Sequence, residues 1–232
     1  MKLWKTIVVA AAIPAIICLA VGGWYFFQHY DHRNYLFNLG EVVPGKIYRS
    51  GQLKVDNLEE VVKKYGIKSI VCLRGKEDSD VTALAKQLGV KIIGIELTSK
   101  RPPKPEQLGL IMKVLSGSSF NPSDYSGVIR QQLGLDGDSV KLSPPYIIHC
   151  AAGADRTGYI VAVYRICFQG WTPQKARLEM LRYFHLPSQY PALWASLKQI
   201  DPPKFCPAYN PDYKPAIPAR NQEGEKIEQS NH

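Results

Sequence analysis

One ten-residue segment concentrates the side chains of this chain that could do chemistry. Residues 149–158 read His-Cys-Ala-Ala-Gly-Ala-Asp-Arg-Thr-Gly, after an apolar run of strand length and at the start of a helical pattern. The first turn of a helix presents unpaired backbone N–H groups and the positive end of the helix dipole. Small residues let an anion approach this backbone, and Gly153 can adopt a positive φ. The segment therefore predicts an anion-binding turn.

Two side chains in this turn indicate reaction chemistry rather than binding alone. Cys150 lies at the focus of the positive field, which stabilises its thiolate and makes it a nucleophile near neutral pH. Arg156 adds a planar guanidinium that matches two phosphate oxygens. The alternative for Cys150 is a buried structural cysteine, but such a cysteine does not need glycine and arginine at these offsets. The pattern favours a nucleophilic site for phosphate esters.

The elements that must position this turn alternate along the chain. Strand-length apolar runs alternate with helical patterns, which predicts an α/β fold with a mainly parallel central sheet flanked by helices. Residues 34–46 read as a linker, and residues 116–145 as an insertion loop with one helical turn near 129–133. The predicted strands are 47–49, 69–73, 90–97 and 146–149, and the predicted helices are 58–65, 80–88, 105–115, 157–168, 173–184 and 191–200.

The N-terminal segment has the character of a membrane anchor. Residues 6–27 carry no charge, and a helix of that length spans about 33 Å, enough for a hydrocarbon core of about 30 Å. We predict one N-terminal transmembrane helix within residues 1–33. The alternative is a cleaved signal peptide, which the aromatic residues 24–27 disfavour. Lys2 and Lys5 precede the span, so the positive-inside rule places the domain on the extracytoplasmic, periplasmic side.

The composition limits the class of protein to which the chain can belong. The 232 residues have a net charge of +9, 45% hydrophobic residues and five cysteines, which excludes a disordered chain and a disulfide scaffold. Three basic residues and one acidic residue lie at or before Arg33, so the remainder keeps a surplus of seven positive charges. This surplus favours an anionic partner, and the absence of a binding motif argues against nucleic acid. Residues 34–200 form the predicted catalytic domain, and residues 201–232 a Pro-rich polar tail.

The segment 149–158 resembles the signature of the protein tyrosine phosphatase superfamily: Cys, five residues, then Arg and Thr, with His before the Cys. It is most similar to small dual-specificity-type bacterial members. Residues 47–52 and 67–74 are similar to the first two strands of those domains. With the helix at 173–184, the likeness covers residues 41–200.

This resemblance implies a two-step mechanism. Cys150 attacks phosphorus and forms a phosphocysteine, while Arg156 and the loop amides hold the equatorial oxygens. Thr157 hydrogen-bonds the sulfur and assists its departure, and His149 orients the loop. The implied phosphate-binding loop, called the phosphate loop below, consists of Cys150 followed by Ala151, Ala152, Gly153, Ala154, Asp155 and Arg156.

The same loop bears on the substrate. Relatives that act on inositol phospholipids often carry lysines where this chain has Ala151 and Ala154. The resemblance therefore implies a phosphorylated protein, most of all phosphotyrosine, or a small phosphomonoester. Two alternatives stay open: a phospholipid or phosphoinositide phosphatase, favoured by the anchor and the positive charge, and a catalytically weak phosphate-binding module.

The general acid departs from the family pattern. Most relatives use an Asp in the loop that corresponds to residues 98–105, which holds no carboxylate here. Asp155, inside the phosphate loop, is the favoured candidate, and its alternative role is to satisfy the helix N-terminus. Lys100, Arg101 and Lys104 replace the acid with a basic loop that either attracts anionic substrates or is simply solvated. Further candidate acids in the insertion are Asp124, Asp136 and Asp138.

Cysteine usage adds two further hypotheses. Some relatives pair a cysteine near Cys72 with the nucleophile in a protective disulfide, and the alternative is core packing. Cys167 and Cys206 have no assigned role, although an exported domain would permit a disulfide between them. No cluster has metal-ligand spacing, so we expect neither a metal nor a cofactor.

Overall fold

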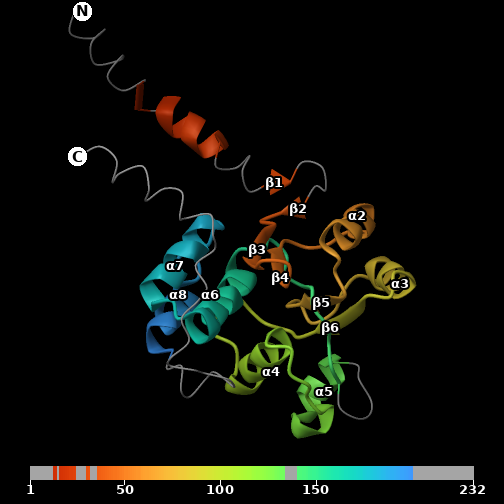
Figure 1. Ribbon diagram of the computed structural model, residues 1–232. Helices are drawn as coiled ribbons and strands as arrows, with labels where there is room; N and C mark the ends of the chain where they lie inside the picture. Colours follow the sequence, from red (N-terminus) through yellow and green to blue (C-terminus); the bar gives the residue numbers. More distant parts are fainter. Residues whose placement is uncertain (1–12, 15, 25–29, 32–35, 134–139, 201–232) are drawn as a thin grey trace, which may run out of the picture.

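The computed structural model describes residues 13–14, 16–24, 30–31, 36–133 and 140–200. Its centre is a five-stranded sheet of order β3-β4-β7-β5-β6, in which only the β3–β4 pair is antiparallel (Figure 1). The predicted α/β class with a mainly parallel sheet is confirmed. The strands are β3 (Gly40–Val43), β4 (Ile47–Ser50), β5 (Ser69–Cys72), β6 (Lys91–Gly94) and β7 (Tyr146–His149).

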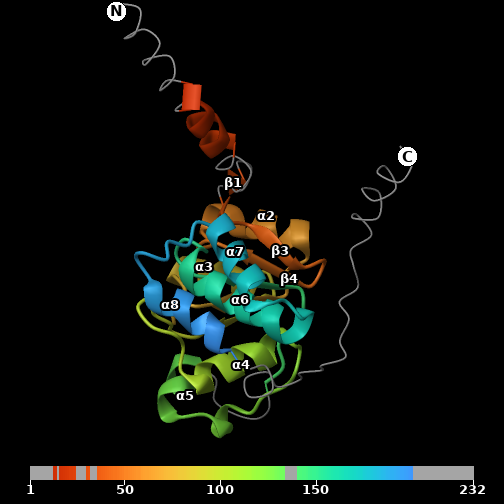
Figure 2. The same ribbon diagram turned by 90° about the vertical axis from the view of Figure 1, so that its left-hand side faces the viewer.

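Helices cover both faces of this sheet, so its central strands are buried on both sides. Successive side chains of a strand point to opposite faces, and accordingly Ile70 and Ile147 join one apolar core while Val71 and Ile148 join the other. The smaller core lies under α2 (Val55–Tyr65) and α3 (Ser79–Gln87). The larger core lies under α4 (Pro105–Leu115), α6 (Asp155–Gln169), α7 (Pro173–Arg182) and α8 (Pro191–Ser196), the last three of which face the viewer in Figure 2.

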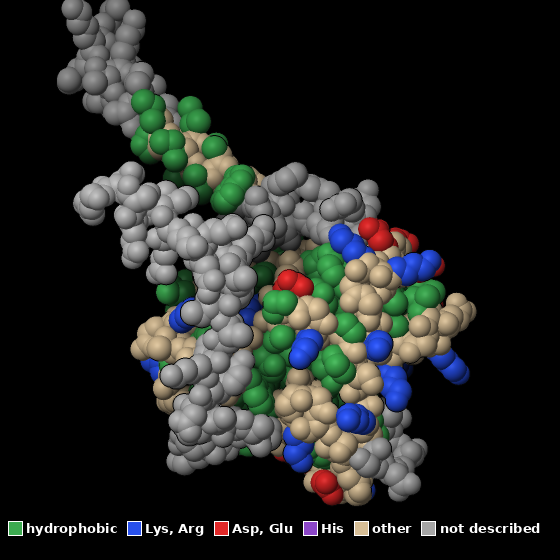
Figure 3. Space-filling model, in the orientation of Figure 1, with side chains coloured by type: hydrophobic (Ala, Val, Ile, Leu, Met, Phe, Trp, Pro, Cys, Tyr) green, Lys and Arg blue, Asp and Glu red, His purple; other side chains and the backbone are tan. Residues whose placement is uncertain are grey.

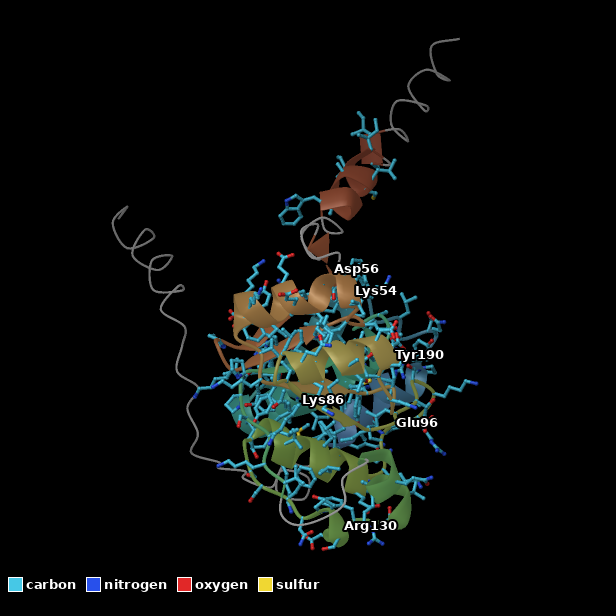
Figure 4. The ribbon with its side chains drawn as sticks, turned by 90° about the vertical axis from the view of Figure 1, so that its right-hand side faces the viewer. Lys54, Asp56, Lys86, Glu96, Arg130 and Tyr190 are labelled. Carbon is cyan, nitrogen blue, oxygen red and sulfur yellow. The ribbon has the colours of Figure 1, made fainter. Side chains whose placement is uncertain are left out.

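Glycines end two helices as the sequence indicates. Gly66 after α2 and Gly170 after α6 both adopt the left-handed conformation, with φ of 64°. The N-cap of α2 is Lys54, not a residue with a short capping side chain. The Asn57 side chain instead accepts a hydrogen bond from the Lys54 N–H at 2.9 Å from within the first turn. Figure 4 shows Lys54 and Asp56 at this end of the helix.

The interpretation of residues 34–46 as a linker was wrong in part. Within this segment β2 (Leu36–Phe37) pairs with β1 (Tyr30–Asp31), and β3 forms the edge of the main sheet. The missed strands are only two to four residues long. Such short strands are too brief to show a period-2 pattern, and tertiary pairing decides them.

The described parts of the insertion, residues 116–133 and 140–145, pack against the domain. Beyond α4 the insertion forms a 3₁₀ turn at Pro122–Asp124 and the helix α5 (Gly127–Leu133), which includes the predicted turn and begins two residues before it. Phe120 pairs with Val140 through an isolated β-bridge. Phe120, Ile129 and Leu142 are buried in the larger core, so this segment contributes to folding.

The predicted anchor lies largely outside the described residues. Residues 13–14 and 16–24 are helical, and their apolar side chains are exposed (Figure 3). Within the described ranges no helix has both the length and the hydropathy needed to cross a bilayer. The Pro-rich tail at 201–232 also lies outside the described residues.

Candidate active site

The phosphate loop connects the carboxyl end of β7 to the amino end of α6. Gly153 has a φ of 70°, and its N–H donates to the Cys150 Sγ at 3.3 Å. A Cβ on Gly153 would lie 2.5 Å from the Ser50 carbonyl oxygen, so no other residue fits here. The loop thus curls around the cysteine sulfur, and α6 directs the positive end of its dipole toward it.

Donors from two other segments hold the loop from outside. Asn38 Nδ2 donates to the Ala152 carbonyl at 2.9 Å, and the Gln52 N–H donates to the Ala151 carbonyl at 2.9 Å. Across a trans peptide, the C=O and the N–H point in opposite directions. Because the carbonyls of Ala151 and Ala152 accept from donors outside the loop, the N–H groups that follow them point into the loop. These contacts therefore prepare the amides for an anion before it arrives.

Arg49 on β4 is a third support of the loop, and sequence reasoning missed it. Its Nη2 donates to the Gly153 carbonyl, and its guanidinium lies 3.6 Å from the centroid of the Tyr183 ring. The side chain is fully buried, and burial lowers the pKa of Arg49. A charged residue inside a short apolar strand was the signal available in the sequence.

Arg156 is anchored by one of its three nitrogens. Its Nη1 lies 3.3 Å from the carbonyl oxygens of both Leu73 and Leu97, which follow β5 and β6. Its Nε is buried and has no hydrogen-bond partner within the described part of the chain. The other N–H groups of the anchored guanidinium therefore remain able to donate to two oxygens of a phosphate.

Thr157 and Asp155 begin α6 in different environments. Thr157 Oγ1 is buried and makes no hydrogen bond within the described ranges, so the predicted bond to the Cys150 sulfur is not formed in this structure. Asp155 is partly exposed, and its Oδ1 lies 2.7 Å from Nδ1 of His185, a buried residue that the sequence analysis did not single out. Of the other candidate acids, Asp124 ends the 3₁₀ turn of the insertion, and Asp136 and Asp138 lie outside the described residues.

His149 is fully buried beneath the loop. Its Nδ1 lies 3.2 Å from the Cys150 carbonyl oxygen, and its Nε2 lies 2.6 Å from Oε2 of Glu77. Burial by itself would lower the pKa of His149, but the contacts with Cys72 and Glu77 outweigh burial and raise it to about 10. Burial likewise opposes ionisation of Glu77, yet the His149 contact leaves the Glu77 pKa below its ordinary value.

Cys72 lies opposite His149 in the β5–β7 register. Its thiol faces the Lys76 carbonyl oxygen at 3.7 Å and interacts with the His149 ring. Cys72 and Cys150 are both free thiols, so the proposed redox pair stays a prediction. Cys167 is disulfide-bonded, and Cys206, the partner that an exported domain would permit, lies outside the described residues.

The fold also brings together ligand types that are far apart in sequence. Cys72, Glu77 and His149 each place one potential metal-ligating atom within 4.8 Å of the others. Two tetrahedral zinc ligands of these types would be separated by about 3.3 Å, because zinc lies about 2.0 Å from each. The 2.6 Å between Nε2 and Oε2 is instead the distance of a direct ion pair.

The basic loop borders the site. Arg101, Lys104 and Gln107 line a pocket of about 270 Å³ together with Leu97, whose carbonyl anchors Arg156. Gln107 Nε2 also donates to the Glu96 carbonyl at 2.8 Å. In Figure 4, Glu96 and Tyr190 lie on the same side of the domain.

Comparison with known proteins agrees with this site. Residues 35–166 match the tyrosine phosphatase family, and no curated protein sequence matches the chain. The core catalytic domain of the PP-IP phosphatase SIW14 from S. cerevisiae has a TM-score of 0.53 at 19% identity, over 84% of this chain and 92% of that one. P. aeruginosa TpbA has a TM-score of 0.53 at 20% identity, over 75% and 90%. Its cysteine-to-serine variant in complex with phosphotyrosine has a TM-score of 0.52 at 19% identity, over 75% and 90%.

The matched segment covers more than half of the chain and includes the cysteine, the arginine and all five strands of the central sheet. The chain therefore belongs to the tyrosine phosphatase family. It is a cysteine-dependent phosphatase, a phosphoric monoester hydrolase. The structural neighbours are too distant in sequence to transfer a substrate, and they establish the fold alone.

Proposed function

We propose that the protein hydrolyses aryl phosphomonoesters, most of all phosphotyrosine in proteins, through a phosphocysteine intermediate. The observation that carries the proposal is the anchoring of Arg156 on the Leu73 and Leu97 carbonyls, beside a loop whose Gly153 amide already donates to the Cys150 sulfur. A nucleophile, a fixed guanidinium and inward amides thus converge on one point.

The first step transfers the phosphoryl group to sulfur. The Cys150 thiolate attacks phosphorus, an S–P bond forms, and the P–O bond to the leaving group breaks. The free N–H fork of Arg156 and the amides of the phosphate loop hold the three non-bridging oxygens, where negative charge must be stabilised. The leaving oxygen takes a proton from an acid, for which we propose Asp155.

The geometry of Asp155 suits that role. Its Oδ1 is engaged by His185, which leaves Oδ2 to carry the proton. In the second step a water molecule attacks the phosphocysteine, Asp155 accepts the proton of that water, and the S–P bond breaks to return the Cys150 thiolate. Thr157, whose buried hydroxyl has no partner within the described residues, is placed one helical position after Arg156 and can donate to the departing sulfur.

Two features bear on the substrate class. The side chains at 151 and 154 are alanines, so the loop itself offers no lysine to a second phosphate. The structural neighbour TpbA has been captured as a variant with phosphotyrosine, which supports an aryl monoester. Against this, the neighbour SIW14 is a PP-IP phosphatase, and the pocket beside Arg101 and Lys104 would favour a substrate with further negative charge.

One comparison tests the proposal. The full chain is given phosphotyrosine peptides, inositol polyphosphates and anionic phospholipid vesicles in parallel, with Cys150→Ser as the blank. We expect the largest kcat/KM for the peptides. Preferential turnover of the inositol polyphosphates or of the lipids would identify the alternative substrate class, and binding without turnover of any of them would identify a phosphate-binding module.

We further propose that residues 1–33 anchor the enzyme in a membrane, with the domain on the extracytoplasmic side. Six large apolar side chains of the described helical residues 13–24 are exposed, and such a surface needs an apolar environment (Figure 3). The disulfide bond of Cys167 supports an oxidising compartment. A reporter fused after residue 232, active only outside the cytoplasm, tests the topology.

A further inference from the structure

We propose that the start of the Pro-rich tail, residues 201–209, docks in an apolar groove at the end of the domain opposite the phosphate loop, and that a disulfide bond between Cys167 and Cys206 holds it there. Three observations carry this inference: the groove itself, the bonded state of Cys167, and the length of chain that follows Ile200. The docking is independent of the phosphatase chemistry proposed above.

The groove, called the rear groove below, has a volume of about 490 Å³, a size at which pockets commonly accept a ligand. Strands β4 and β7 begin beside it, α4 ends there, and the last turns of α6 form one wall. The phosphate loop joins the other end of β7 to the other end of α6, a helix of 15 residues and hence about 22 Å long. The apolar side chains that line the rear groove are Val43, Ile47, Leu115, Tyr146, Tyr164 and Phe168.

The state of the cysteines identifies the occupant of the rear groove. Cys167 also lines this groove, and it is disulfide-bonded. The chain has five cysteines, of which Cys18, Cys72 and Cys150 are free thiols. Cys206 is therefore the cysteine that remains for the bond with Cys167. Because a disulfide holds the two Cα atoms about 4–7 Å apart, the segment around Cys206 is brought to the groove wall.

The length and composition of the tail suit this position. Ile200 packs against the larger core, to which Cys167 also belongs. Cys206 follows six residues later, and an extended chain of six residues spans about 20 Å. Phe205 and Pro207 flank Cys206, and apolar side chains of this kind gain free energy when they leave water for an apolar groove. The bond and the burial of apolar surface therefore favour the same docked arrangement.

Docking should follow the redox state of the bond between Cys167 and Cys206. Dithiothreitol, a dithiol, reduces this bond by thiol–disulfide exchange. The reagent gives up two electrons and two protons and becomes a cyclic disulfide, while the S–S bond of the protein breaks and leaves two thiols. The rear groove is thus covered in an oxidising compartment and open in a reducing one.

Cleavage by trypsin after Lys204 measures the docking. The full chain is digested without reductant, and the cut at Lys204 is followed over time by mass spectrometry. We expect the wild type to be cut about tenfold more slowly than Cys206→Ser, because cleavage follows the population in which the segment is open. A peptide map of the wild type should contain Cys167 linked to Cys206. Dithiothreitol should raise the wild-type rate to that of Cys206→Ser.

A change in the groove separates docking from tethering. Phe168→Asp places a charge in the wall of the rear groove and leaves both cysteines in place. Cleavage after Lys204 should then rise about fivefold, although the peptide map still contains the bond. Leu178→Asp, at an exposed apolar position of α7, is the matched control and should be cut as slowly as the wild type. If Phe168→Asp does not fold, Val43→Asp on the edge strand β3 replaces it.

Three outcomes would overturn the docking. The first is a peptide map in which Cys167 is not bonded to Cys206, and the second is a disulfide-linked dimer on a non-reducing gel, which would make a second copy of the chain the partner. The third is equally slow cleavage after Lys204 in the wild type and in both groove variants, which would show that the bond alone protects the segment. Because none of these measurements uses turnover, they decide the docking whether or not the protein hydrolyses an aryl phosphate.

Discussion

Nδ1 of His185 lies 2.7 Å from Oδ1 of Asp155 and joins the first turn of α6 to the connection between α7 and α8. The His185 ring is buried and stacks with the rings of Tyr190 and Trp194, at centroid distances of 6.5 and 5.8 Å. These stacked rings and the contact with His185 Nδ1 hold the carboxylate beside the phosphate loop. The orientation of Asp155 is therefore set by residues that the sequence pattern did not mark.

If Asp155 is the acid, its loss should matter most for poor leaving groups. Asp155→Asn should lower kcat about 10²-fold for phenyl phosphate, which needs a proton, and much less for p-nitrophenyl phosphate. The slope of log kcat against leaving-group basicity checks this. Asp124→Asn, in the insertion, is the control and should match the wild type. An unchanged slope in Asp155→Asn would remove Asp155 as the acid.

The nucleophile and the guanidinium should each be essential. Cys150→Ser and Arg156→Lys should each lower kcat on p-nitrophenyl phosphate by about 10³-fold or more. Lysine cannot reproduce a planar guanidinium anchored on two carbonyls with N–H groups to spare for phosphate. Steady-state kinetics of the wild type and the two variants measures both effects. Vanadate should inhibit the wild type. Activity of Arg156→Lys near the wild-type level would contradict the anchored geometry.

Gly153 should tolerate no side chain. Gly153→Ala combines a left-handed backbone, which costs about 1–2 kcal/mol, with a Cβ 2.5 Å from the Ser50 carbonyl oxygen. We expect the melting temperature to fall by about 5 °C and turnover to be lost. Gly89→Ala is the matched control, since Gly89 has a φ of 71° but open space around it. Its melting temperature should fall less, and its turnover should remain. Equal effects of the two changes would show that the Ser50 contact is irrelevant.

Stability should depend on pH through His149. The pKa of His149 is raised from 6.5 to about 10 in the folded protein, so its contribution is complete below about pH 6.5 and is lost as pH rises toward 10. Urea unfolding at pH 6, 8 and 9.5 should show the unfolding free energy falling, by up to about 1.4 kcal/mol per pH unit. The unfolding free energy of His149→Gln should fall less steeply over the same pH range. If the unfolding free energy fell equally with pH in the wild type and in His149→Gln, the titration of His149 would not be its cause.

The basic loop should act on substrate capture. Replacing Arg101 and Lys104 by Gln should raise KM for an anionic substrate several-fold at low salt and leave kcat unchanged, because the pocket that they line borders the site without reaching the reacting atoms. The effect should shrink at high salt. Lys86→Gln, at an exposed position of α3 (Figure 4), serves as the control. If the two changes leave KM untouched at low salt, the loop is merely solvated.

The sequence alone determined the features that depend on neighbouring residues. The order of strands and helices follows from periodicity and from glycine stops such as Gly66 and Gly170, because these act within one or two turns of backbone. The anion-binding turn is also local, since its cysteine, glycine and arginine lie within seven consecutive residues.

The tertiary structure decided how that turn is held and charged. Asn38 and Arg49 reach the loop from 114 and 104 residues away, and His185 reaches Asp155 from 30 residues away. The short strand β3, the packed insertion and the Glu77–His149 pair arise in the same way, from contacts between segments that carry no common local signal. Pairing across the sheet and burial between layers depend on the whole fold, so residue types and spacing could predict the chemistry of Cys150 but not the groups that tune it.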